Sequence, residues 1–151
     1  MSDRRLDELI RSGRARAPDC TVYLLPRDDG QYVNHASDVL ALLEESGVSV
    51  DYATDPVAAG IHAEKSADLV LPPLLILFSD AATLAGAIEG VIYVIRWFIG
   101  TRNHRHVMVE VTLQEDADGS TRRTLTLDAE GATVDEVARL LKQAGGTWKA
   151  R

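Results

Sequence analysis

The chain has 151 residues, of which 46% are hydrophobic and 26% charged, and this composition excludes a disordered or collagen-like protein. Its formal net charge of −7 argues against non-specific binding to nucleic acid or to an anionic membrane surface. The single cysteine, Cys20, excludes an internal disulfide and a cysteine-rich zinc site, and it favours a reducing, cytoplasmic location.

The N-terminal third of the chain predicts an arm followed by a strand, a helix and a second strand. Residues 1–18 are expected to form the arm, since a short amphipathic stretch there leads into a Gly, Ala and Pro linker. The β-prone run 21–25 predicts a strand. Apolar residues at helical spacing over 36–43 predict a helix that ends before Gly47, and alternation over 48–52 predicts another strand.

A long apolar stretch occupies the middle of the chain. Residues 55–68, which precede it, have no firm periodicity and predict a loop or a short irregular helix. Ser79 and Asp80 are suitable N-cap residues for a long helix reaching Ile99. Residues 74–78 fit either a strand or the beginning of that helix.

The C-terminal third predicts a β-hairpin and a final helix. Apolar and polar residues alternate over 107–113 and again over 124–129, with Asp118-Gly119 suited to the turn between them. Thr133 and Glu136 have capping-box spacing, and the apolar stripe that follows is expected to close at Gly145-Gly146.

These elements predict an α+β protein. A mixed sheet that includes the C-terminal β-hairpin packs against a long apolar central helix and a C-terminal helix. Residues 19–146 form a single α+β domain in this interpretation, residues 1–18 an N-terminal arm and residues 147–151 a C-terminal tail.

The long helix carries the main candidate for partner binding. Its projection at 100° per residue places the large apolar residues on one face and Glu89, Tyr93 and Arg96 on the other. Beside that polar stripe, Ala82, Gly86 and Gly90 form a ridge of small residues that another backbone can approach closely. The chain's own sheet or helices could cover the ridge instead, which is the more usual arrangement for an apolar helix in a small domain.

A second candidate lies where the long helix ends. Arg96, Trp97, Arg102 and Arg105 form a cationic and aromatic rim that could contact a partner, or could simply complement the negative end of the helix dipole. His104 and His106 are spaced to share one face of a strand, but two ligands are too few to predict a metal site.

No catalytic residue, metal ligand or cofactor is predicted. Cys20 has no local signature of a partner base, and the chain lacks the Gly-rich turns that hold phosphates. Glu89, Tyr93 and Arg96 are left as an alternative ligand-binding or enzymatic site that would form only in the folded protein.

From about Leu74 to Gly145 the order of elements, Trp97 near the end of the helix and the Asp118-Gly119 pair follow a familiar layout. This half of the chain resembles the effector-associated constant component family, small α+β domains of bacterial NTP-dependent conflict systems. The resemblance implies a non-enzymatic adaptor or regulator in antiviral defence that works beside an effector, a peptidase or an NTPase.

The sequence therefore predicts a cytoplasmic, non-enzymatic protein-interaction component of a bacterial defence system. Its expected partner is a protein of the same system, with a homo-oligomer also open and nucleic acid not expected. The first alternative is a membrane-active effector that inserts residues 74–99, since the 19 residues from Ala81 to Ile99 within that segment are nearly long and apolar enough to span a bilayer. The second alternative is the site around Glu89, Tyr93 and Arg96.

Overall fold

The computed structural model describes residues 21–27, 31–33, 35–53, 61–62, 69–78, 80–100, 106–115 and 122–149. The predicted arm (1–18), Cys20, the hairpin tip with Asp118-Gly119, and Arg102, His104 and Arg105 lie outside these ranges. Within the described residues a mixed sheet packs against a long apolar helix and a C-terminal helix, so the predicted α+β class is confirmed.

The described strands are β1 (Val22–Leu24), β2 (Tyr32–Val33), β3 (Val50–Tyr52), β4 (Ile61–His62), β5 (Leu69–Val70), β6 (Leu74–Phe78), β7 (His106–Glu115) and β8 (Arg122–Glu130). The described helices are α2 (Ala36–Glu45), α4 (Ala81–Gly100) and α5 (Val134–Lys149). Residues 74–78 are thus a strand, and the long helix starts after Asp80.

Two crossovers through helices build the centre of the sheet. Strands β1 and β3 pair in parallel and are joined through α2, while β6 and β7 pair in parallel and are joined through α4. Parallel neighbours need such a crossover, because a tight turn can only reverse the chain. The two units meet where β1 pairs antiparallel with β6. Outside this sheet, β2 and β4 form a separate parallel pair.

The strand beside β7 is interrupted by two prolines. Both β5 and β6 pair in parallel with β7, with Val70 opposite Met108 and Leu74 opposite Val111. Residues 71–73 therefore face two residues of β7, which is the geometry of a bulge. Pro72 and Pro73 have no N–H to give to a ladder, which explains why the pairing breaks at this point.

The C-terminal hairpin is confirmed. Strands β7 and β8 pair antiparallel, with His106 opposite Glu130 and Gln114 opposite Arg122. In β7, Val107, Val109 and Val111 are buried on the helix side of the sheet, as the alternation predicts.

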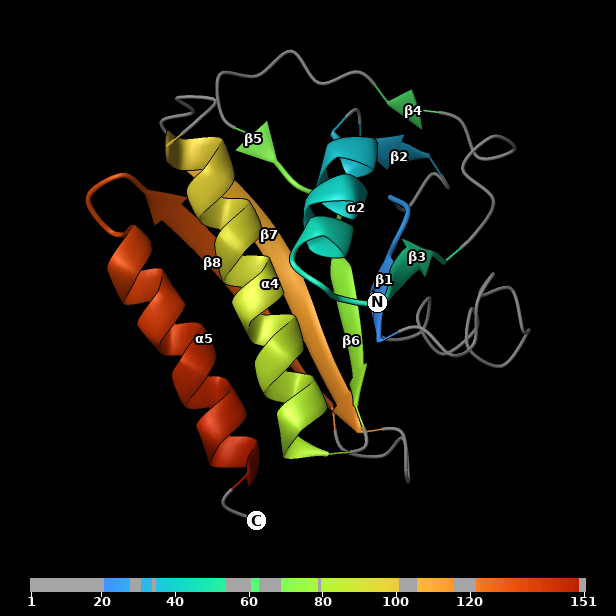
Figure 1. The fold of residues 1–151 in the computed structure, drawn as a ribbon. Coiled ribbons are helices and arrows are strands. Elements are labelled where there is room, and N and C mark those ends of the chain that lie inside the picture. Colours follow the sequence, from blue (N-terminus) through green and yellow to red (C-terminus); the bar gives the residue numbers. More distant parts are fainter. Residues whose placement is uncertain are drawn as a thin grey trace.

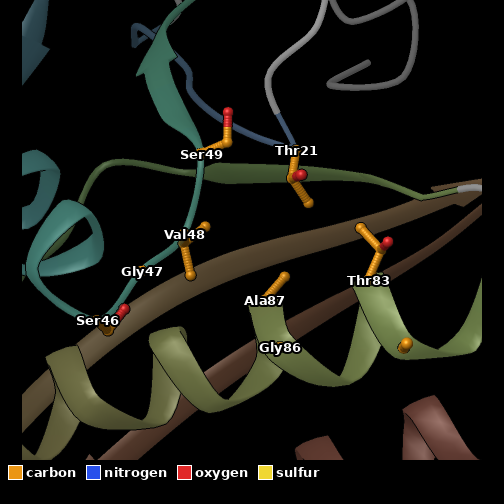
Figure 2. A pocket seen from close by; sticks show the side chains of 9 residues that line it. Thr21, Ser46, Gly47, Val48, Ser49, Thr83, Gly86 and Ala87 are labelled. Carbon is orange, nitrogen blue, oxygen red and sulfur yellow. The ribbon is translucent and has the colours of Figure 1, made fainter.

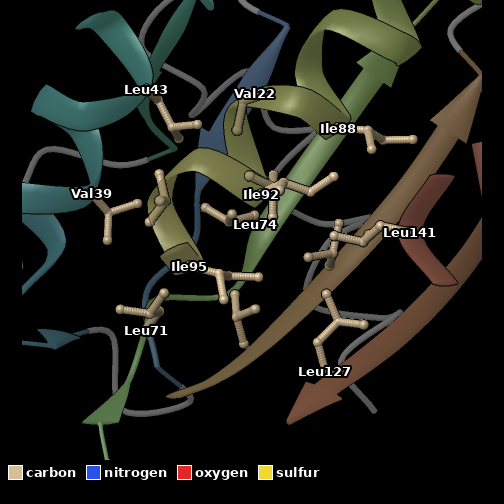
Figure 3. Packing of buried hydrophobic residues seen from close by; sticks show 14 of the residues in the cluster. Val22, Val39, Leu43, Leu71, Leu74, Ile88, Ile92, Ile95, Leu127 and Leu141 are labelled. Carbon is tan, nitrogen blue, oxygen red and sulfur yellow. The ribbon is translucent and has the colours of Figure 1, made fainter. Parts of the chain in front are cut away.

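All three described helices cover the same face of the sheet, with α4 between α2 and α5 (Figure 1). One hydrophobic core lies between the helices and the sheet. Ile88, Ile92 and Ile95 of α4 point into it between Leu43 of α2 and Leu141 of α5 (Figure 3). Because α4 has a neighbouring helix on each flank and the sheet beneath it, an unusually apolar sequence is needed to fill its contacts.

The start of α4 follows the predicted cap. Asp80 Oδ1 accepts a 2.7 Å hydrogen bond from the backbone N–H of Thr83, one of the N–H groups that a helix leaves without a carbonyl. The backbone hydrogen bond from Thr83, and then the Thr83 hydroxyl, hold the pKa of the Asp80 carboxyl below its usual value.

The end of α5 differs from the prediction. The helix continues through Gly145 and Gly146 to Lys149, so residues 147–149 are helical and do not belong to a tail. A Cβ atom on Gly145 would lie 2.7 Å from Ile88 Cδ1 of α4, which shows that this glycine lets two helices pack closely. A glycine that looks like a helix end in the sequence is here a packing residue.

The start of α5 also differs from the predicted capping box. The hydroxyl of Thr133, expected to bond forward within a capping box, accepts a 2.9 Å hydrogen bond from the backbone N–H of Glu130. The Thr133 carbonyl accepts from the N–H of Val137, so the residue does begin the helix. Thr133 therefore ties the end of β8 to the first turn of α5.

Candidate interaction surface on α4

The two predicted faces of α4 are present in the structure. Leu84, Ile88 and Phe98 are buried, whereas the side of the helix turned away from the sheet is exposed. The exposed positions include Ala82, Ala85, Gly86, Glu89, Tyr93 and Arg96. The face directed to solvent therefore combines small residues in its first half with polar residues in its second half.

The three residues of the predicted small-residue ridge have different surroundings. Gly90 is buried, and a Cβ atom there would lie 2.7 Å from Val48 Cγ2 and 3.1 Å from Ser46 Oγ. This part of the ridge is already covered by the segment that joins α2 to β3. Gly86 is exposed, and a Cβ atom on it would meet nothing within 4 Å. Ala82 is exposed one turn earlier.

Ala82 and Gly86 border a hollow of about 260 Å³ on the surface of the molecule. Figure 2 shows Thr83, Gly86 and Ala87 of α4 on one side, with Thr21 and the segment Ser46–Ser49 on the other. We call this feature the α4 hollow; its lining residues are Thr21, Ser46, Gly47, Val48, Ser49, Ala82, Thr83, Gly86 and Ala87.

Local structure holds the wall opposite α4 in place. Gly47 has a φ of 91°, a conformation that glycine adopts without strain, and it turns the chain at the end of α2. The N–H groups of Gly47 and Val48 donate to carbonyls of the last turn of α2. The Ser46 hydroxyl donates to the carbonyl of Leu43 at 2.8 Å. This wall is therefore the hydrogen-bonded C-terminal end of α2 and the segment that leads from it into β3.

The chemistry of the α4 hollow is neutral. Its polar side chains are the hydroxyls of Thr21, Ser46, Ser49 and Thr83, and none of the described lining residues is charged. Hydroxyls can donate to carbonyls and accept from N–H groups. The described lining is therefore suited to binding a neutral polar group.

The polar stripe of α4 faces α5 and forms two exposed ion pairs with it. Arg96 Nη1 lies 2.7 Å from Asp135 Oδ1, and Glu89 Oε1 lies 3.4 Å from Lys142 Nζ. Tyr93 lies between these two bridges in sequence, and 37% of it is exposed. Both charged groups of the alternative ligand site are thus engaged by α5, as the simpler structural interpretation of the stripe expects.

Only part of the predicted cationic rim can be examined. Arg96 contributes to the bridge with α5, and the ring of Trp97, which is partly buried, packs edge-on against Phe98 at 5.0 Å. Arg102 and Arg105 lie outside the described residues. His106 lies in β7, where Nε2 is 2.5 Å from Asp128 Oδ1 and 3.7 Å from Glu130 Oε1.

The sequence identified one wall of the α4 hollow and missed the other. The small size of Ala82 and Gly86 predicts a contact surface at their positions, whereas no pattern in the sequence singles out Thr21, Ser46 or Ser49. Gly47 was recognised as a helix end, which places the loop but does not say what it faces. The two walls come from segments far apart in the sequence and meet only in the folded chain. Local sequence patterns therefore cannot predict that they face each other.

Comparison with known protein families, characterised proteins and solved structures finds no match to this chain. Helix α4 is long and apolar enough to cross a membrane by length and composition. However, half of its most apolar 18-residue stretch is buried inside the molecule. The core helix of a water-soluble domain passes the same test. Among the described residues, no group of three or more His, Cys, Asp or Glu side chains could hold a metal ion.

Proposed function

We propose that this chain is a non-catalytic protein-interaction component, and that a partner protein binds at the α4 hollow. The observation that supports this most directly is the open space above Gly86, where an otherwise well-packed helix exposes small residues beside a rigid, hydroxyl-lined wall. Small residues let a partner backbone come close, and hydroxyls can satisfy its N–H and carbonyl groups.

The neutral lining defines the kind of partner segment. A charged side chain would lose hydration in the hollow without an opposite charge to compensate it, so a neutral polypeptide segment fits better. The volume of about 260 Å³ suits one or two inserted side chains and not a whole cofactor. Binding would therefore combine a small anchor in the hollow with contacts over the exposed face of α4.

We further propose that the partner belongs to the same bacterial defence system, as an effector, a peptidase or an NTPase. This step rests on the family resemblance of residues 74–145. The adaptor role agrees with a hollow that offers binding groups but no reactive ones. Arg96 and Trp97 lie later on the same helix and would border a larger contact area.

The test fills the hollow without disturbing the core. Gly86→Leu places a side chain in the open space, while Ala85→Leu adds the same bulk at an exposed position of the same helix that does not line the hollow. Purified products of the adjacent genes are titrated against each variant by calorimetry. We expect Gly86→Leu to weaken binding at least tenfold and Ala85→Leu to leave it within about twofold.

Equal effects of the two variants would refute the hollow as the binding site. The interaction role itself would be refuted if none of the adjacent gene products bound the unmodified protein. Circular dichroism of both variants checks that α4 is intact, and both should keep the helix because leucine is a better helix former than glycine and only slightly worse than alanine.

A further inference from the structure

Strand β8 forms one edge of the main sheet over its whole length. It has 9 residues, each opposite a residue of β7, and no other described strand pairs with it. The backbone groups that point away from β7 are therefore available to a further strand. A continuous edge of this length spans about 30 Å.

The edge lacks several devices that prevent strand addition. Strand β8 contains no proline or glycine, and its register with β7 runs without a bulge from Gln114–Arg122 to His106–Glu130. Thr124, Thr126 and Asp128 are exposed on the sheet face opposite the helices. The edge is thus regular and half polar.

The charge pattern of β8 is complementary to itself. The strand begins with two arginines at 122 and 123, and it ends with Asp128 and Glu130. In an antiparallel pair of two such strands, the basic start of one lies beside the acidic end of the other. With Thr126 opposite its own copy, Thr124 faces Asp128, Leu125 faces Leu127, and position 122 faces Glu130.

The helix above this edge offers a matching apolar contact. Leu140 of α5 is 52% exposed, although it is a large hydrophobic residue. At 100° per residue it lies on the opposite side of α5 from Lys142 and Asp135, which bind α4. Leu140 therefore lies on the flank of α5 that has no helix beside it in Figure 1.

We propose that a second copy of this chain binds at the β8 edge, so that two sheets join antiparallel about a two-fold axis at Thr126. The same axis brings the two α5 helices together along their free flanks, with Leu140 of each copy in the contact. A two-fold contact uses one patch twice, as the self-complementary strand requires. The α4 hollow is outside this contact, so the proposal is independent of the partner-binding role.

The proposed contact combines a strand edge with the free flank of a helix. Strand pairing gives direction through backbone hydrogen bonds, while the helix contact adds apolar area. Stable interfaces bury roughly 1,000 Å² or more in total, and a strand alone rarely reaches this. Both parts should therefore be needed.

The first test measures mass in solution by sedimentation velocity over a range of protein concentrations. The unmodified chain should sediment as a dimer. Thr126→Lys places two like charges at the two-fold axis, and Leu140→Glu does so between the helices, so each should raise the dimer dissociation constant at least tenfold. Tyr93→Glu changes the other large exposed hydrophobic residue, which lies on α4, and should leave the dimer unchanged.

The second test fixes the register. In a Cys20→Ser background, Thr126→Cys should form a disulfide-linked dimer on mild oxidation, because the two residues face each other at the axis. Thr124→Cys, two residues from the axis, should cross-link far less. A strictly monomeric protein, or a dimer that keeps its affinity in both Thr126→Lys and Leu140→Glu, would overturn the proposal.

Discussion

At the scale of single residues, Asp80 controls the start of α4. Its carboxylate accepts from the N–H of Thr83, and this bond keeps the carboxyl ionised at lower pH than in the unfolded chain. A carboxyl with a lowered pKa in the folded state stabilises the protein above its unfolded pKa, and that contribution disappears as pH falls through the folded pKa.

We expect Asp80→Asn to keep part of the cap and lose its pH dependence. The melting temperature of the variant should lie below that of the unmodified protein at pH 7, and the difference should shrink as the pH falls below about 4. Thermal melts between pH 2 and pH 7 measure this. Glu44, an exposed carboxylate near the end of α2, provides a control through Glu44→Gln. A constant difference across the whole range would contradict the electrostatic explanation.

At the scale of elements, glycines set how closely the helices pack. Gly90 is enclosed by Val48, Ser46 and Leu43 at the end of α2, whereas the atom nearest to a Cβ on Gly145 is the flexible tip of Ile88. The exposed ion pairs between α4 and α5 add little to stability, because solvent screens them and the side chains lose entropy. The close contact at Gly90 should therefore matter more for stability than these ion pairs.

An alanine series tests this ranking. Gly86→Ala should stabilise the protein by up to about 1 kcal/mol, since it improves helix propensity in open space. Gly90→Ala should destabilise it by about 1–2 kcal/mol, because the stiff Val48 side chain cannot move aside cheaply. Gly145→Ala should be nearly neutral. Urea unfolding gives all three values, and a stabilised Gly90→Ala would show that the contact at α2 is loose.

At the scale of the whole molecule, the position of α4 bears on the membrane-insertion alternative. Its apolar side contacts the core from Leu84 to Phe98 and has α2 and α5 on its flanks. To reach a bilayer, the helix would have to leave the core, which means losing most of the buried area that stabilises the fold.

We therefore expect the amides of α4 between residues 84 and 98 to exchange hydrogen in the slowest class, together with those of β6 and β7. Native-state exchange followed by mass spectrometry measures this. Flotation with phosphatidylcholine and phosphatidylglycerol vesicles should leave the folded protein at the bottom of the gradient. Early exchange of α4 combined with flotation would favour a helix that is released to insert into lipid.

The core face of α4, the cap at Asp80 and the C-terminal hairpin could all be predicted from the sequence. Each depends on residues close together in the chain. Apolar residues recur every 3.6 residues in a helix and every 2 residues in a strand, so such local patterns can be recognised in the sequence. Segment 74–78 was ambiguous, because a short apolar run fits a buried strand or a helix equally well. Its pairing with β1 and β7 decides the matter.

Sequence by itself determined the class of fold, the order of most elements and the side of α4 that faces water, since hydrophobic patterning acts locally. Only the tertiary structure decided that Gly86 faces open space, Gly90 faces α2 and Gly145 faces α4. It likewise decided that Thr21 and Ser46–Ser49 form the second wall of the α4 hollow. A glycine carries no side chain to show what it contacts, so its role depends on which distant segment the folded chain brings against it.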